Sequence, residues 1–148
     1  MAREKALDVA TRRAQAWILG ADTVVVVDDQ ILGKPRDAAD AKRMLLALSG
    51  RQHDVFTAFA VVAPERRIFA ERIVRTIVRF RSISKAEIDE YVQSREPFGK
   101  AGAYAVQGAA RAFVAELRGS HSNVVGLPID EVREVLRGAG VWTEKPTA

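Results

Sequence analysis

Apolar and polar positions follow two different periods along the chain, and these periods predict both strands and helices. A nearly continuous aliphatic run at residues 17–27 predicts a strand that is buried on both faces. Two longer runs of strand character, at residues 52–63 and 67–80, are separated by a short turn. In the second of these runs the residues alternate loosely, with Arg75 and Arg79 in one set and Val78 and Phe80 in the other, so one face of the sheet is expected to be wetter.

Four segments have the helical period, with apolar residues gathered on one side. They lie at residues 2–16, at residues 37–49, in a short stretch that begins at Ser84, and in a last stretch from Ile129 to about Gly138. Asp37 is expected to cap the second helix, and Ser84 with Glu87 forms a capping box for the third. In the last helix Ile129 is expected to point inward. Because strands and helices alternate, we predict an α/β fold with a mixed sheet.

The composition indicates one globular domain over residues 1–148, with 48% hydrophobic and 28% charged residues. No linker or internal repeat divides it, and residues 143–148 are expected to be a frayed tail. The absence of cysteine excludes disulfides and thiolate zinc sites, and it fits a reducing cytosol. No apolar run approaches the roughly 20 residues of a membrane span. We therefore expect a cytoplasmic protein without a membrane partner.

The chain is basic, with a formal net charge of +4. Its cations are dispersed, without a run of five like charges, so a dedicated role in binding nucleic acid is disfavoured as a third-ranked alternative. A small polyanion such as a nucleotide fits the same charge. His53 and His121 lie far apart without metal-ligand spacing, and we interpret each as a hydrogen-bonded structural or surface histidine. The phosphate loop G-x-x-x-x-G-K-[ST] and the serine elbow G-x-S-x-G are absent from the sequence.

One polar step, Asp22-Thr23, interrupts the aliphatic run at residues 17–27. An ionised carboxylate in apolar surroundings needs partners, so the interruption calls for a chemical reason. Asp22 is a candidate general base toward water, or a candidate ligand of a divalent metal. The alternative is a buried carboxylate whose hydrogen bonds are satisfied within the fold.

The other candidates suit a polyphosphate: Lys34, Lys100, Glu96, Thr23 and Gln107. Lys34 and Lys100 are cations beside glycines, where little bulk obstructs a phosphate. Glu96 is a second carboxylate for a shared metal, whereas Thr23 and Gln107 are neutral groups of the kind that bind a base edge. The glycines and proline of residues 96–108 predict a site loop. Alternatively the lysines lie on the surface and Gln107 is a plain loop residue. Spacing alone does not name a reaction.

Six motifs follow one another along the chain: GADTVV at 20–25, LGKP at 32–35, LSGxxHxVxT at 48–57, TxVxF at 76–80, EPxxKAGAYxxQG at 96–108 and NVVGLP at 123–128. The similarity around these motifs extends over about residues 5 to 137. In this order they resemble the Maf family, the nucleotide pyrophosphatases related to septum-formation inhibitors.

The resemblance implies hydrolysis of a nucleoside triphosphate between its α and β phosphates, with a divalent metal, Mg²⁺ or Mn²⁺. It also implies an elongated α/β fold like that of the inosine-triphosphate pyrophosphatases, and a homodimer. In this family pattern Asp22 matches the proton acceptor, and Thr23 and Gln107 match positions tied to substrate choice. The matches to polar cleft positions are Lys34, Glu96 and Lys100, and Asp22 with Glu96 is the implied metal pair.

Residues 100–108 are similar to the branch of the family that acts on dTTP and UTP. The branch that acts on 7-methyl-GTP has Cys-Ala-Gly-Ser there and a glutamate where Gln107 stands. One common form has an aspartate where this chain has Gly99, so that carboxylate is not a ligand here. A non-catalytic, nucleotide-binding regulator of cell division or septum formation stays open as the alternative function.

Family members open with a strand, a Ser-Pro-Arg-Arg phosphate-binding turn and an Asp-Glu pair, ahead of the helix at residues 2–16. Arg12 and Arg13 lie within that helix and do not replace the turn. Preorganised cations stabilise the charge that develops on the phosphates, so the loss of each such group lowers the rate of hydrolysis by roughly 10²–10³-fold. On the resemblance, we expect the 148-residue chain to lack the first strand and the turn, to be weakly active or inactive, and to be less stable than a longer relative.

Overall fold

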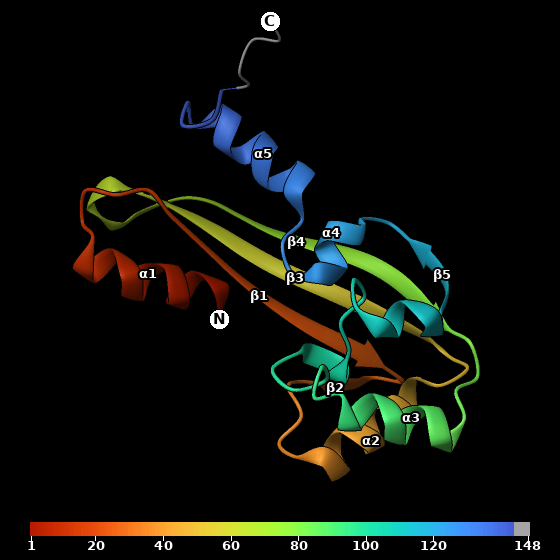
Figure 1. The fold of residues 1–148 in the computed structure, drawn as a ribbon. Coiled ribbons are helices and arrows are strands. Elements are labelled where there is room, and N and C mark those ends of the chain that lie inside the picture. Colours follow the sequence, from red (N-terminus) through yellow and green to blue (C-terminus); the bar gives the residue numbers. More distant parts are fainter. Residues whose placement is uncertain (144–148) are drawn as a thin grey trace, which may run out of the picture.

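An elongated five-stranded sheet runs through the computed structural model of the chain, which describes residues 1–143 (Figure 1). Its strands are β1 (Ile18–Val27), β2 (Gln30–Leu32), β3 (Gln52–Ala63), β4 (Arg67–Phe80) and β5 (Val114–Arg118), in the order β2-β1-β3-β4-β5. All the pairings between these strands are antiparallel. The α/β class is confirmed, but the described sheet is antiparallel rather than mixed, because tight turns join β1 to β2 and β3 to β4 and reverse the chain.

Two tight turns reverse the chain, and the one between β3 and β4 lies where the sequence predicts it. Asp28 and Asp29, between β1 and β2, both have positive φ, at 47° and 61°. This is the pattern of the hairpin turn whose twist matches that of the flanking strands. Glu65 and Arg66 adopt the same region between β3 and β4, and both long strands have the predicted bounds. The predicted tail at residues 143–148 lies outside the described residues, apart from Thr143.

The helices are α1 (Ala2–Arg12), α2 (Ala38–Leu48), α3 (Lys85–Gln93), α4 (His121–Val125) and α5 (Ile129–Gly138). The predicted caps are confirmed, since the Asp37 carboxylate accepts from the Asp40 N–H and the capping box of Ser84 and Glu87 is complete. The first helix is shorter than predicted. Ile129 is 43% exposed, so its predicted inward orientation is wrong. Among residues 1–143, no helix is long and apolar enough to cross a membrane.

At one end of the sheet, α1 and α5 cover opposite faces. The last five residues of β3, from Phe59 to Ala63, are all buried. Phe59 and Val61 pack against α5, whereas Ala60 and Val62 pack against α1. Alternate strand residues point to opposite faces, so this stretch of β3 is sandwiched between two helices.

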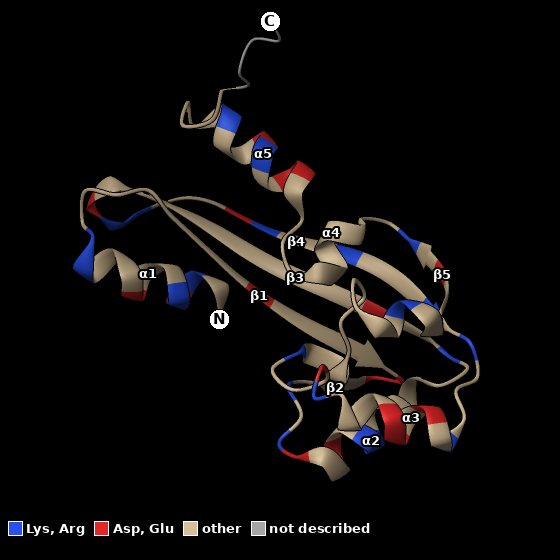
Figure 2. Ribbon diagram, in the orientation of Figure 1, with Lys and Arg blue, Asp and Glu red and all other residues tan. Residues whose placement is uncertain are grey.

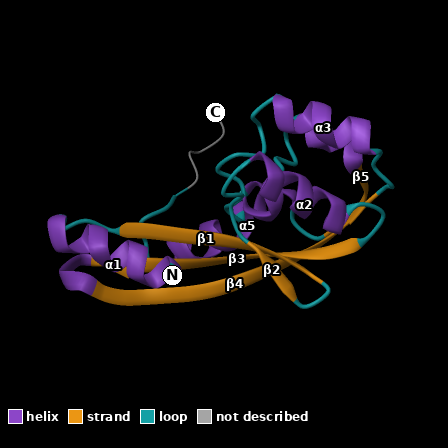
Figure 3. Cartoon of the chain, turned by 90° about the horizontal axis from the view of Figure 1, so that it is seen from below, coloured by secondary structure: helices purple, strands orange, loops and turns teal. Residues whose placement is uncertain are grey.

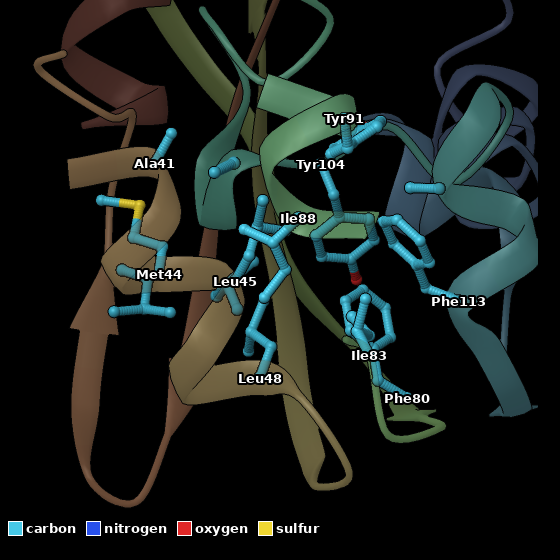
Figure 4. Packing of buried hydrophobic residues seen from close by; sticks show 14 of the residues in the cluster. Ala41, Met44, Leu45, Leu48, Phe80, Ile83, Ile88, Tyr91, Tyr104 and Phe113 are labelled. Carbon is cyan, nitrogen blue, oxygen red and sulfur yellow. The ribbon is translucent and has the colours of Figure 1, made fainter. Parts of the chain in front are cut away.

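The larger core lies at the other end, where α2 and α3 stack together on one side of the sheet (Figure 3). Figure 4 shows Leu45 and Leu48 of α2 beside Ile88 of α3, with the rings of Phe80 and Tyr104 next to them. The opposite face of this end is more open: Val24 and Val26 of β1 are only half-buried, and Leu19 farther along β1 is 39% exposed. The prediction of a first strand buried on both faces is therefore wrong.

Gly20 sets how closely α1 approaches β1. A Cβ atom at this position would lie 2.7 Å from the Ala2 carbonyl oxygen and 2.9 Å from the Ala6 Cβ. We expect Gly20→Ala to lower the free energy of unfolding by about 1–3 kcal/mol, because helix backbone must move to relieve the overlap. Urea denaturation measures the effect. Gly33→Ala is the control, since among the described residues no atom beyond the two chain neighbours lies within 4 Å of its Cβ position; equal losses in the two variants would contradict the prediction.

Candidate active site

A solvent-open cleft of about 230 Å³ lies where α1, β1, α4 and the loop at residues 99–107 meet. Five of the six predicted site residues line it together: Asp22, Thr23, Lys34, Lys100 and Gln107. The sixth, Glu96, is not among the lining residues. Three separate segments of the chain therefore contribute the predicted groups to one place: β1, the loop at Lys34 and the loop at residues 99–107.

Asp22 is the one acidic residue of β1, and it is the red band that interrupts this otherwise uncharged strand in Figure 2. Strand β2 pairs with β1 only at Val25–Val27, so Asp22 lies on a part of β1 that β2 does not cover. Its carboxylate is about one-fifth exposed, and Oδ1 accepts a 2.6 Å hydrogen bond from Lys5 Nζ. The partner that the sequence analysis expects for the Asp22 carboxylate is therefore Lys5, on α1.

Sequence reasoning missed Lys5. This lysine looks like one more charge on the polar side of a marginal helix, and no local motif marks it. It reaches Asp22 because Ala2 and Ala6 press α1 onto Gly20, two residues before Asp22. The lysine also lines the cleft. The close packing of α1 on β1 is therefore what brings this cation to the site.

Lys34 and Lys100 lie on two loops that are tied to each other. The Gly102 N–H donates to the Gly33 carbonyl at 3.1 Å. Gly102 has φ of +71°, and a Cβ there would lie 2.9 Å from Val25 Cγ2, so a larger residue would separate the loops from β1. With Lys5, the cleft presents three lysines around one carboxylate, a balance that attracts an anionic ligand.

Two neutral groups complete the polar lining. The Thr23 hydroxyl lies 2.9 Å from that of Thr57, its direct neighbour on β3. Gln107 is exposed at the end of the loop. Their side chains therefore offer uncharged hydrogen-bonding groups beside the lysines, and their assignment to substrate choice stays a prediction.

Glu96 is used in a different way from the one predicted. Its Oε1 accepts a 3.1 Å hydrogen bond from the Ala109 N–H, and the carboxylate packs directly on Gly108, where a Cβ would overlap Oε1. Burial raises the pKa of Tyr91, and the nearby Glu96 carboxylate raises it further. These contacts fix the loop at residues 96–108 from its outer side. A role for Glu96 as a metal ligand stays a prediction that this placement does not favour.

The donor set suits a metal that arrives with its substrate. Among the described residues no three His, Asp or Glu side chains gather into a metal-binding group. Asp22 is the only carboxylate among the cleft-lining residues. Magnesium is commonly held by one or two carboxylates together with substrate phosphates and water. One carboxylate beside a phosphate-binding surface meets that requirement, whereas a resident metal site would need more ligands from the protein.

His53 supports the wall of the cleft from behind. Its side chain is buried, and its Nε2 shares a 2.8 Å hydrogen bond with the hydroxyl of Tyr104, which lines the cleft. The Phe80 ring packs edge-on against both residues. Burial lowers the pKa of His53 to about 4. The interpretation of His53 as a structural histidine is confirmed, and His121 is exposed, as the surface interpretation requires.

The buried His53 predicts a loss of stability in acid. The unfolded chain binds the proton with a pKa near 6.5 and the folded chain only near 4, so stability falls as the pH drops through this interval. We expect His53 to account for a loss on the order of 3 kcal/mol. Urea denaturation at pH 7 and pH 4.5 measures it, and His53→Gln should remove most of this pH-dependent part. His121→Gln should retain it; a His53→Gln profile parallel to wild type would contradict the assignment.

Comparison with known proteins identifies the family of the chain. The family model described as Maf-like protein matches residues 1–139. A protein of Shewanella sp. (strain MR-7) named dTTP/UTP pyrophosphatase is 49% identical over 144 residues, which are 95% of this chain and 73% of the relative. A protein of the same name from Myxococcus xanthus is 49% identical over 141 residues, covering 95% of this chain and 70% of the relative. The chain belongs to the Maf-like protein family.

Proposed function

We propose that the chain hydrolyses nucleoside triphosphates to the monophosphate and pyrophosphate, with dTTP and UTP as preferred substrates. The observation that carries the proposal is Asp22, a carboxylate in an open cleft that also presents Lys5, Lys34 and Lys100. The relatives named dTTP/UTP pyrophosphatase support the choice of nucleotide. We place the activity in the cytoplasm, where nucleoside triphosphates are abundant.

In this mechanism Asp22 is the general base. Lys5 binds Oδ1 and orients the carboxylate, and Oδ2 takes a proton from the attacking water. The water oxygen bonds to phosphorus while the bridging P–O bond between the α and β phosphates breaks. The electron pair of the broken bond leaves on the displaced group, which is either pyrophosphate or the monophosphate. Lys34 and Lys100 bind the phosphate oxygens and stabilise their charge. A divalent metal, held by Asp22 and the phosphates, would supply further charge neutralisation.

The test is pyrophosphate release from a panel of canonical ribo- and deoxyribonucleoside triphosphates, with Mg²⁺ or Mn²⁺ and with a chelator as the metal-free control. The proposal expects release that is greatest with dTTP and UTP and is abolished by the chelator. Binding of nucleotides without release from any of them would overturn it in favour of a nucleotide-binding regulator. Release of inorganic phosphate alone would overturn the assignment of the cleaved bond.

Lys100 should matter mainly through the charge that it brings to the cleft. We expect Lys100→Met to lower kcat/KM for the preferred triphosphate by about 10²-fold, because a preorganised cation at the phosphates is lost. Steady-state pyrophosphate release measures the change. Lys85→Met is the matched control, since Lys85 is exposed at the start of α3 and does not line the cleft. Equal activities of the two variants would remove Lys100 from the phosphate site.

A further inference from the structure

The Thr23 hydroxyl belongs to a chain of buried hydrogen bonds that leads away from the cleft. It lies 2.9 Å from the Thr57 hydroxyl, and Thr57 Oγ1 donates to the backbone carbonyl of Asn123 at 3.0 Å. Thr57 and Asn123 are both completely buried, so water does not compete for the bond between them. Of the three hydrogen-bonded residues, Thr23 is the one that lines the cleft.

This series of hydrogen bonds fixes which way each hydroxyl proton points. A threonine hydroxyl has one proton to donate. Thr57 gives its proton to the Asn123 carbonyl, because a carbonyl oxygen only accepts. Thr57 therefore accepts from Thr23, and the Thr23 proton points into the protein. The remaining lone pair of Thr23 Oγ1 is what the residue offers to a ligand, so Thr23 presents a hydrogen-bond acceptor to the cleft.

Asn123 is held too firmly to reverse this order. Its Nδ2 donates to the carbonyls of Val55 on β3 and Val74 on β4, and to the hydroxyl of Thr76. A flipped amide would turn its oxygen toward two carbonyl oxygens, which is repulsive. The amide thus clamps α4 to the sheet and keeps the Asn123 backbone carbonyl over Thr57.

The space beside the Thr23 hydroxyl is kept free by a glycine. Gly126, which ends α4, has φ of +129°, and a Cβ there would contact Thr23 Oγ1 at 3.7 Å. The absence of that side chain leaves the acceptor accessible from the cleft. A ligand group with a hydrogen to donate is the complement of this position.

We infer that Thr57 and Asn123 are positioning residues that hold Thr23 as an acceptor for the imide N–H of a uracil or thymine base. The inference rests on the proposed function and deepens it. The imide N3–H is the one donor on the pairing edge of uracil and thymine. Cytosine carries an acceptor at the same ring position, so it would set two acceptors against each other. A buried acceptor left without a donor lowers affinity by about tenfold.

The test replaces Thr57 with valine, which has the same shape but no hydroxyl. Thr23 can then turn its own proton toward the cleft and donate to cytosine. We expect the ratio of kcat/KM for UTP to that for CTP to fall by about tenfold in Thr57→Val, through KM rather than kcat. Thr57→Ser retains the hydroxyl and should restore the ratio. Thr76→Val is the control for stability, since Thr76 bonds Asn123 but not Thr23.

Calorimetric binding of UMP and CMP, without metal, makes the test independent of turnover. If the wild type prefers UMP and Thr57→Val loses that preference, the inference is supported, even where no triphosphate is hydrolysed and the proposed function fails. If the wild type hydrolyses UTP but Thr57→Val keeps the wild-type ratio, the inference is overturned while the function stands. An equal change in Thr76→Val, or no preference for UMP in the wild type, also overturns it.

Discussion

Pyrophosphate release is expected to fall by about 10³-fold when Asp22 is replaced by asparagine, because the amide has no basic oxygen to accept a proton from water. Asparagine has nearly the shape of aspartate and can still accept a hydrogen bond from Lys5, so the contact between α1 and β1 should be retained. Steady-state release with the preferred triphosphate and saturating Mg²⁺ measures the effect, and the loss should appear in kcat.

Asp29→Asn is the matched control for this variant. Asp29 is exposed in the turn between β1 and β2 and has φ of +61°, a conformation that asparagine tolerates well. Its activity should equal that of the wild type. Thermal unfolding of both variants checks that the fold is unchanged. An Asp22→Asn enzyme with more than a tenth of wild-type turnover would contradict the general-base role and leave Asp22 as a partner of Lys5 alone.

The largest effect on stability is expected for Phe80→Ala, with a loss of about 3–5 kcal/mol. The Phe80 side chain is completely buried, and its ring packs edge-on against His53, Tyr104 and Phe113. Removing it loses the burial of the ring and leaves a cavity that three aromatic neighbours cannot close. Because Tyr104 lines the cleft, turnover should fall as well. Urea denaturation gives the change in free energy.

Phe69→Ala provides the comparison for an exposed ring. Phe69 is 45% exposed on β4 and makes an edge contact with Trp17. Its removal should cost about 1 kcal/mol or less, because nearly half of the side chain is already exposed to solvent. Turnover should stay at the wild-type value, since Phe69 does not line the cleft. Similar losses of stability in Phe69→Ala and Phe80→Ala would contradict the assignment of the main core to the α2 and α3 end of the sheet.

The polar groups of the cleft lie partly on strand β1 and partly on two loops that are hydrogen-bonded to each other. Asp22 and Thr23 lie on β1, whose backbone is paired with β3 over this stretch. Lys34 and Lys100 lie on loops that a single backbone hydrogen bond joins, from Gly102 to Gly33. The groups that require accurate placement, a base and a directional hydroxyl, are therefore on the sheet. The cations, whose attraction depends less on direction, are on the loops.

The sequence by itself determined the three long strands, four of the helices and most of the cleft residues. The bounds of β3 and β4, the Asp37 cap and the capping box at Ser84 are local, because each depends on residues a few positions apart. The polar step at Asp22-Thr23 also marked the site locally, because a carboxylate within an aliphatic strand can be recognised from that strand alone. Its motifs also supplied the resemblance that the family model matches.

Only the tertiary structure decided which groups meet. Lys5 reaches Asp22 across 17 residues, and Asn123 directs the Thr57 hydroxyl across 66. The structure also turned Glu96 toward Ala109 rather than into the cleft, and left one face of β1 partly open. These pairings depend on how helices approach the sheet, at Gly20 above all, and such distances follow from packing in three dimensions that no local pattern of residues encodes.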